Sequence, residues 1–522
     1  MTATQTASLP RWARLPLALV CGLAMGLAAA PWNLWYLGFA GLVGAFWLAG
    51  VAPKGVRSAG TGWMVGLGYF GFSMGWIVEP FMVDPAETGW MAPFGLLGLG
   101  GGLALFWALA FWAAGHLRRW HMPALVIAWT AAELARGYVL TGLPWGLIGY
   151  LWLPVPPIQW VSLVGPYGLT FLTLAAAGLL AEALPRPGAF RQAPRPWPAR
   201  MGFAPGIVLG LALLAALFGG GRALVPPVQD LDGRPVVRLV QPNAPQHLKW
   251  RRDMVPVYYQ RQMDYTGAPA EEGREPALIV WPETALPMLL HDASDALSQI
   301  SLLAGKAQVV VGLQREEDGA WYNMLALMGP NGTLRQVYDK YHLVPFGEYM
   351  PAAALFAKFN ILGLASRAEG GYTPGSGPML LGLGGTLGTA LPLICYEAVF
   401  PQDVHAAPAR PDMLLQITND AWFGSFSGPY QHLAQARIRA IEQGLPMVRA
   451  ANTGVSAVID GAGRVLAEIP LNREGYLDTP LPPPMRLTVY SKSGDLPVLL
   501  MLFVLAGLLW RPARREAERE TD

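Results

Sequence analysis

The chain has 522 residues, of which 53% are hydrophobic and only 14% are charged, so it is too apolar for an ordinary soluble protein and too long for one domain. Its 37 basic and 35 acidic residues give a net charge of +2, and no basic patch interleaved with aromatic residues points to nucleic acid. This composition predicts a protein embedded in a membrane.

Eight apolar windows approach the ~20 residues that a membrane-spanning helix needs. They are 12–30, 33–51, 60–78, 94–115, 122–139, 157–181, 203–221 and 496–510. We therefore expect a polytopic α-helical membrane protein with about eight transmembrane helices. Seven would lie in a first domain, 1–222, and the eighth in 490–511, followed by a tail at 512–522.

Lysine and arginine fall in alternate loops between these windows, the bias that marks cytoplasmic loops. They are Arg11, Arg14, Lys54, Arg57, Arg118, Arg119, Arg186, Arg191, Arg195, Arg200, Arg511, Arg514, Arg515 and Arg519. This pattern predicts that both termini are cytoplasmic. The large segment after the seventh window would then lie outside, in the periplasm if the membrane is the inner membrane of a Gram-negative bacterium.

That segment, 225–485, alternates strand-like and helical patterns. The predicted strands are 236–242, 277–283, 308–314, 322–328, 391–397, 412–420 and 455–460. The predicted helices lie near 250–265, 292–305 and 430–443, the last ended by Gly444. Continuous apolar strands indicate a sheet covered on both faces, so the segment should be a layered α/β domain.

Polar side chains follow several of these strands, where sites assemble in layered α/β folds. Glu283 stands in "WPETALP", Lys340 and Glu348 in "YDKYHLVPFGEYMP", and Cys395 in "LPLICYEAVFP". Together they form a workable acyl-transfer set, in which a carboxylate takes the thiol proton and an ammonium steadies the oxyanion. Each alone has a structural alternative: a helix cap, a surface charge, a turn residue or an inert core cysteine.

Cys395 is one of only two cysteines. Cys21 falls in the first apolar window, so the two cannot pair, and Cys395 would be a lone thiol in an oxidising compartment. A strand-to-helix turn aims backbone N–H groups at the sulfur, which should favour the thiolate. This pattern favours a nucleophile.

The motifs "WPET", "YDKYHLVPFGEY" and "ICYE" resemble the nitrilase, or carbon–nitrogen hydrolase, superfamily and its Glu-Lys-Cys triad. Adding "TNDAWFG" (418–424), "RAANTGVSAVID" (449–460) and the arrangement of apolar windows, the whole chain resembles the membrane-integrated apolipoprotein N-acyltransferase branch. The resemblance implies a nitrilase-like αββα sandwich in 225–485. It also implies Glu283, Lys340 and Cys395 as the catalytic residues.

The resemblance further implies a two-step reaction without a cofactor. Cys395 would take an acyl chain from a membrane phospholipid, typically phosphatidylethanolamine, and pass it to the α-amino group of an apolipoprotein's S-diacylglyceryl-cysteine. Lys340 and the backbone N–H after Cys395 would hold the oxyanion. Supporting residues would be Glu348, Tyr396 and Glu397, with Trp250 of "QPNAPQHLKW" binding substrate.

Two apolar stretches could meet lipid. One is 350–364, where Phe356 and Phe359 would dip into the outer leaflet as a lid, and the other is 421–426 with Trp422. In both cases ordinary core packing is the alternative interpretation.

Glu133 and Arg136 lie three residues apart near the outer end of the fifth window, followed by a Trp-rich stretch with Trp145. Ions within a membrane are costly and point at a partner or a cavity. A substrate-facing role for Arg136 and Trp145 and a self-satisfied ion pair both remain open.

Other chemistry has little support in the sequence. Seven scattered histidines and two distant cysteines do not build a zinc site, and no phosphate-binding glycine loop is present. Two rival functions remain: a membrane-anchored amidase that hydrolyses its thioester, and a transporter or receptor whose domain only binds a ligand. An amidase needs no lipid-facing lid, and a binding module needs no complete triad.

Overall fold

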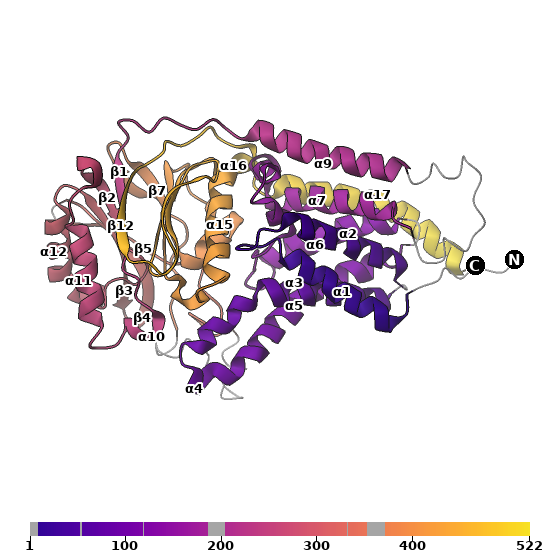
Figure 1. Ribbon diagram of the computed structural model, residues 1–522, viewed down its shortest axis with the longest axis horizontal. Coiled ribbons are helices and arrows are strands. Elements are labelled where there is room, and N and C mark those ends of the chain that lie inside the picture. The colour runs from indigo at the N-terminus through magenta and orange to yellow at the C-terminus, as the bar shows by residue number, and fades with distance from the viewer. Residues whose placement is uncertain are drawn as a thin grey trace. The chain divides into compact units, whose positions relative to one another are not determined.

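The computed structural model describes residues 9–52, 55–117, 120–185, 204–330, 332–351 and 371–521. The chain divides into two compact units (Figure 1). A helical unit comprises Met1–Pro226 and Lys492–Asp522, and an α/β unit comprises Pro227–Ser491.

In the helical unit, each of the eight predicted apolar windows contains a helix. These are α1 (Arg11–Gly26), α2 (Trp35–Val51), α3 (Val56–Ser73), α5 (Ala92–Ala114), α6 (His121–Tyr138), α7 (Val161–Glu182), α9 (Ala204–Leu224) and α17 (Leu496–Thr521). Short helical turns lie between them: η1 (Gly75–Met82), α4 (Pro85–Thr88), η2 (Gly89–Met91), η3 (Ile148–Trp152) and η4 (Pro156–Trp160). Helix α16 (Val489–Ser493) precedes α17.

By length and composition, three helical stretches in the described part of the chain could cross a membrane: Pro85–Ala114, Pro156–Glu182 and Pro205–Leu224. Trp35–Val51 and Leu496–Leu509 are apolar but shorter. The presence of apolar helices agrees with a membrane protein, whereas the number of eight spans stays a prediction.

Helices α1 and α3 approach each other closely because small residues face the contact. A Cβ added at Gly22 would lie 2.0 Å from the carbonyl oxygen of Val65, and one at Gly68 would lie 2.3 Å from that of Leu19. Small residues that let backbones meet are the usual device where lipid removes the hydrophobic drive for helix association.

Glu133 and Arg136 form a buried ion pair on α6, with 3.0 Å between Arg136 Nη2 and Glu133 Oε2. Arg136 Nη1 also donates to the carbonyl oxygens of Leu143 (2.5 Å) and Trp145 (2.8 Å), and Trp107 Nε1 donates to Glu133 Oε1 at 2.7 Å. The ion-pair interpretation accounts for all these contacts, since they tie the loop after α6 to the helices. Substrate binding by Arg136 and Trp145, each 1% exposed, stays a prediction.

The α/β unit contains two six-stranded sheets, with strand orders β12-β1-β2-β3-β4-β5 and β11-β10-β9-β8-β7-β6. The first sheet consists of β1 (Val236–Gln241), β2 (Pro276–Val280), β3 (Gln308–Glu317), β4 (Ala320–Met328), β5 (Leu334–Asp339) and β12 (Gly475–Pro480). The second consists of β6 (Leu381–Gly384), β7 (Gly388–Ile394), β8 (Met413–Thr418), β9 (Met447–Ala451), β10 (Ser456–Ile459) and β11 (Val465–Ile469). Strands β1, β2 and β3 run parallel in the first sheet, and β7, β8 and β9 run parallel in the second. Within each sheet, the carboxyl ends of these strands therefore lie along the same edge.

The unit is built as helices, sheet, sheet and helices (Figure 1). Helices α11 (Val255–Thr266) and α12 (Ser294–Ala304) cover the first sheet, and α14 (Pro401–His405) and α15 (Gly428–Gln443) cover the second. Shorter turns are α10 (Gln246–Lys249), η7 (Glu271–Gly273), η8 (Leu290–Asp292), η10 (Cys395–Val399) and η11 (Asp420–Phe423). A central apolar core, including Val280, Leu415 and Ile417, joins the inner faces of the two sheets.

All seven predicted strand segments contain a strand, and the three predicted helices form. Gly444 ends α15 in the left-handed conformation (φ 62°, ψ 36°) that favours glycine. Strands β5, β6, β9, β11 and β12 were not predicted. Four of them are short or partly exposed, and in β9 the charged Arg449 interrupts the apolar run.

A buried ion pair closes one edge of the first sheet. Arg238 on β1 donates to both carboxylate oxygens of Asp478 on β12, at 2.7 and 2.6 Å, and also to the carbonyl oxygens of Tyr265, Thr266 and Ala268. Removing one partner of such a pair leaves an uncompensated buried charge.

We expect Asp478→Asn to lower the free energy of unfolding of the α/β unit by roughly 3–5 kcal/mol, measured by urea denaturation of the detergent-solubilised protein. Asp253→Asn is the matched control, because its pair with Arg251 is exposed, and it should leave the transition unmoved. Equal transitions for the two variants would contradict this account.

Candidate active site

Cys395 is the first residue of η10, directly after β7, and its side chain is buried. Its φ of 51° lies in the left-handed region, which costs a residue other than glycine about 1–3 kcal/mol and persists only when the surroundings enforce it. Gln416 Nε2 donates to the Cys395 carbonyl oxygen at 3.0 Å. The cysteine predicted at a strand end therefore lies in a constrained turn.

Glu283 follows β2 and is fixed through both carboxylate oxygens. Oε1 accepts a 2.7 Å hydrogen bond from Asn323 Nδ2 on β4, and Oε2 accepts one of 2.8 Å from the backbone N–H of Asn419. Its backbone packs so closely on β3 that a Cβ at Gly312 would lie 2.4 Å from the Pro282 carbonyl oxygen. The position of Glu283 thus depends on contacts with both sheets.

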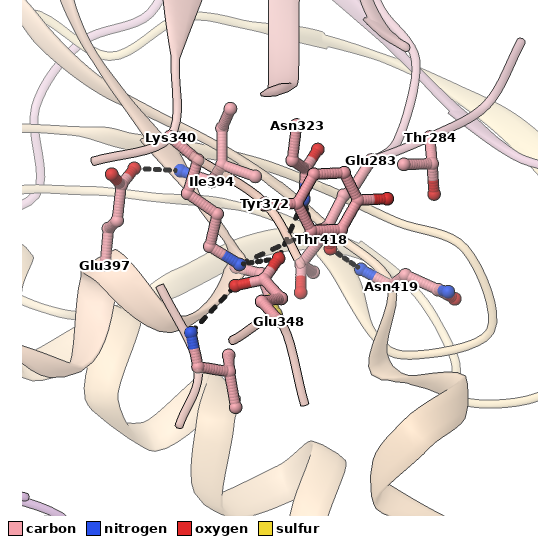
Figure 2. A network of polar contacts seen from close by, with 12 residues as sticks. Glu283, Thr284, Asn323, Lys340, Glu348, Tyr372, Ile394, Glu397, Thr418 and Asn419 are labelled. Atoms are coloured by element: carbon pink, nitrogen blue, oxygen red, sulfur yellow. Dashed lines mark hydrogen bonds and ion pairs between the residues drawn. The ribbon is translucent and has the colours of Figure 1, made fainter. Parts of the chain in front are cut away.

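Lys340 follows β5 and lies between two carboxylates, as Figure 2 shows. Its Nζ is 2.9 Å from Glu348 Oε1 and 3.6 Å from Glu283 Oε1. Asn323 Nδ2 also donates to Glu348 Oε1 at 3.0 Å, and the backbone N–H of Val344 donates to Oε2 at 2.8 Å. Glu283 from one motif and Lys340 and Glu348 from another therefore form one largely buried cluster.

Glu397 connects the Cys395 turn to the Lys340 loop. Its Oε2 accepts from the Ile394 backbone N–H at 2.6 Å, and its Oε1 accepts from Tyr338 OH and the Tyr341 backbone N–H, each at 2.8 Å. Burial raises the pKa of Glu397 to about 7, although these hydrogen bonds act in the opposite direction. Glu397 thereby holds together two segments that carry candidate catalytic residues.

The charges and the burial around Cys395 correct the prediction that its turn favours the thiolate. Burial, followed by the Glu283 carboxylate, raises the pKa of the Cys395 thiol, and the opposing effect of Lys340 is smaller. The expectation that the turn favours the thiolate is therefore wrong: at rest the thiol keeps its proton. Burial lowers the pKa of Lys340, but Glu348, Glu283 and Cys395 outweigh it, so the net pKa is raised and the ammonium stays charged.

The remaining predicted residues are placed as follows. Tyr396 is buried, with its ring edge-on to those of His342 and Phe400 at centroid distances of 5.6 and 4.8 Å. Trp422 is half-buried in η11. Phe356 and Phe359 lie outside the described residues, so the lid stays a prediction.

Trp250 is 40% exposed and lines a hollow beside the backbone of Glu283. Lys249 lines the same hollow, with Nζ 3.0 Å from Thr284 Oγ1 and 3.3 Å from the Glu283 carbonyl oxygen. Burial lowers the pKa of Lys249 to about 8, against the attraction of the Glu283 carboxylate. A second ammonium therefore lies close to Glu283.

Several residues that contact Glu283 and Glu348 were not predicted from the sequence. Asn323 bridges the two carboxylates, Asn419 holds Glu283, and Tyr372 donates its backbone N–H to the Glu348 carbonyl oxygen at 2.8 Å. A polar residue within the apolar strand "YNMLALM" was a usable signal for Asn323. Tyr372, in "GGYTPG", carried no signal.

Comparisons with known proteins match both halves of the chain. Residues 237–486 match the carbon-nitrogen hydrolase family, and residues 21–179 match the apolipoprotein N-acyltransferase N-terminal domain. A solved amidase variant of the nitrilase superfamily, from Nesterenkonia, is 20% identical with a TM-score of 0.36, covering 50% of this chain and 93% of its own. The family match alone covers nearly all of the α/β unit, so this unit is nitrilase-like, that is, similar to the carbon-nitrogen hydrolase family.

Curated relatives extend the match to the whole chain. An apolipoprotein N-acyltransferase of Rhodopseudomonas palustris is 38% identical and covers 95% of both chains. One from Bradyrhizobium diazoefficiens is also 38% identical, covering 97% of this chain and 96% of its own. The chain belongs to the apolipoprotein N-acyltransferase family.

The connection that Glu397 makes between the Cys395 turn and the Lys340 loop can be tested by substitution. In Glu397→Gln one carboxylate oxygen becomes an amide N–H₂, which would face a backbone donor. We expect the α/β unit to lose about 1–3 kcal/mol of stability by urea denaturation. We also expect slower modification of Cys395 by acyl donors, because the Cys395 turn and the Lys340 loop lose their connection.

Glu468→Gln is the control, since Glu468 is exposed on β11. Stability and acylation rate equal to those of the parent protein in Glu397→Gln would contradict the connecting role.

Proposed function

We propose that this chain transfers an acyl chain from a membrane phospholipid to the α-amino group of an apolipoprotein's N-terminal S-diacylglyceryl-cysteine, through a thioester on Cys395. Membership of the family supports lipoprotein N-acylation. The observation that carries the mechanism is the cluster of Glu283, Lys340 and Glu348, whose Lys340 loop is joined to the Cys395 turn through Glu397.

In the first step Glu283 takes the proton of the Cys395 thiol while Sγ attacks the ester carbonyl carbon. A base is required because the buried thiol is protonated at rest. As the ester C–O bond breaks, the proton passes from Glu283 to the departing oxygen. The products are a lysophospholipid and an acyl thioester.

In the second step the acceptor's free amine attacks the thioester carbonyl. Its proton goes to Glu283, the S–C bond breaks, and the thiolate recovers that proton. An amide forms, and the enzyme returns to its starting state with no change in proton count.

Lys340 and the backbone N–H of Tyr396 would stabilise the oxyanion in both steps. Glu348 supports this role by holding the ammonium at 2.9 Å, and Asn323 keeps Glu348 and Glu283 apart at a fixed spacing. Trp250, Trp422, Phe356 and Phe359 are the proposed substrate contacts.

Phosphatidylethanolamine is the proposed donor, and the bacterial inner membrane the proposed location. The helical unit would form the membrane domain, as in the boundaries 1–222 and 490–511. The segment 225–485 would face the periplasm, with both termini and the tail 512–522 in the cytoplasm. Apolar helices and alternating basic loops support this arrangement.

The charges around Cys395 allow a test in which one substitution should change two reaction rates of Cys395 in opposite directions. Glu283→Gln should slow thioester formation from phospholipid by ~10²–10⁴-fold, because the base is lost. The same change should speed alkylation of Cys395 by iodoacetamide, because the Glu283 carboxylate raises the pKa of the thiol. Lys340→Met should slow acylation by ~10²–10³-fold and also slow alkylation, since the ammonium lowers that pKa.

Intact-mass spectrometry measures both reactions on the same protein, with Glu468→Gln as the control. Normal acylation by folded Glu283→Gln would remove Glu283 from the mechanism.

A further inference from the structure

The peptide unit between Cys395 and Tyr396 carries two groups that matter here, the Cys395 carbonyl oxygen and the Tyr396 N–H. In a planar trans peptide the carbonyl oxygen of one residue and the N–H of the next point in opposite directions. The Tyr396 N–H is the proposed oxyanion donor, so whatever holds the Cys395 carbonyl oxygen also sets the direction of that N–H.

A fully buried polar cluster surrounds the Cys395 carbonyl oxygen. It consists of Gln416 on β8, Asp420 in η11, His432 on α15 and Arg449 on β9, all with 0% exposure. Gln416 Nε2 and His432 Nε2 lie 3.0 and 3.1 Å from the Cys395 carbonyl oxygen and 3.1 Å from each other. Four separate elements thus converge behind the nucleophile.

Arg449 fixes the orientation of the Gln416 amide. Arg449 Nη1 donates to Gln416 Oε1 at 2.5 Å, so the Gln416 N–H₂ group faces the Cys395 carbonyl oxygen. The same guanidinium donates through Nη2 to Asp420 Oδ2 at 2.5 Å. Only one orientation of the Gln416 amide lets its oxygen accept from Arg449 while its N–H₂ group donates to the Cys395 carbonyl oxygen.

His432 supports Gln416 from the other side. Its Nδ1 is 2.8 Å from Asp420 Oδ1. Burial opposes ionisation of Asp420, but Arg449 and His432 hold its pKa down at about 2, so the carboxylate accepts and Nδ1 carries a hydrogen. A neutral ring then accepts the second N–H of Gln416 at Nε2, and a protonated ring donates to the Cys395 carbonyl oxygen. Both forms keep the carbonyl held.

We propose that Gln416, oriented by Arg449 and His432, is a positioning residue that fixes and polarises the Cys395–Tyr396 peptide so that the Tyr396 N–H donates to the oxyanion. This inference rests on the proposed acyl transfer. Hydrogen bonds to a carbonyl oxygen strengthen donation by the N–H of the same peptide unit. A donor held in place before reaction is also what stabilises a developing oxyanion.

A purely structural cluster would make a different prediction. If it only packed the second sheet against α15, its loss would lower stability without changing the chemistry of the folded molecules. Two reactions of Cys395 separate these cases. Acylation passes through an oxyanion, whereas alkylation by iodoacetamide is a displacement at a saturated carbon and forms none. Both use the Cys395 sulfur as the nucleophile, so a change that only impaired that sulfur would slow both reactions.

The experiment uses the full-length protein in detergent micelles and compares Gln416→Met with Gln308→Met. Gln308 on β3 has the same pattern of contacts: its Nε2 donates to the Leu383 carbonyl oxygen at 2.7 Å, and its Oε1 accepts from Arg335 Nη1 at 3.1 Å. It is therefore a matched buried glutamine without a link to Cys395.

We expect Gln416→Met to slow thioester formation from phosphatidylethanolamine by roughly 10- to 100-fold per folded molecule, less than the ~10²–10³-fold cost of deleting an oxyanion donor outright. Alkylation should be unchanged, and Gln308→Met should change neither rate. His432→Asn, which loosens Gln416 without removing it, should give a smaller loss confined to acylation.

The inference would be overturned if Gln416→Met slowed acylation and alkylation of Cys395 equally. It would also be overturned if Gln416→Met were acylated at the rate of the parent protein. If Gln416→Met does not fold, His432→Asn decides by the same comparison, and failure of both to fold would mark the cluster as structural. A parent protein that forms no thioester would instead reject the proposed function itself.

Discussion

One buried ammonium between two carboxylates is the constraint on which the α/β unit's site depends. Taking a charge out of water costs several kcal/mol unless partners compensate it. Lys340 has Glu348 at 2.9 Å and Glu283 at 3.6 Å, and Asn323 donates to both carboxylates. The ammonium and the two carboxylates neutralise one another's charge. Moving any one of them would therefore leave a charge without a partner inside the protein.

This cluster also explains why the site needs both sheets. Asn323 lies on the first sheet, and Glu283 and Lys340 follow strands of that sheet, whereas Cys395 and Asn419 follow strands of the second. The shared apolar core brings the sheets together, and Glu397 connects the Cys395 turn to the Lys340 loop. The site is therefore complete only where the two sheets pack together.

The sequence could predict residues that stand at strand ends, because the end of an apolar run marks the edge of a sheet. Glu283 and Cys395 were found this way. Lys340 follows β5, a strand that was not predicted, and it was singled out by its chemistry and by the resemblance of its motif. Asn323 and Gln416 lie within strands and act through contacts with segments distant in the chain, which periodicity does not encode. The raised pKa of Cys395 was missed because it depends on burial and on the Glu283 carboxylate, which only the folded arrangement defines.

The central claim is that a single thioester on Cys395 carries the acyl chain between two lipid substrates. The most direct measurement loads the protein with a labelled acyl chain from phosphatidylethanolamine, removes free phospholipid, and adds a diacylated lipopeptide with a free N-terminal cysteine amine. The account predicts that the label leaves Cys395 and appears as an amide on the lipopeptide in a single turnover, and that Cys395→Ala acquires no label. Release of the label as free fatty acid, or loading of Cys395→Ala, would contradict it.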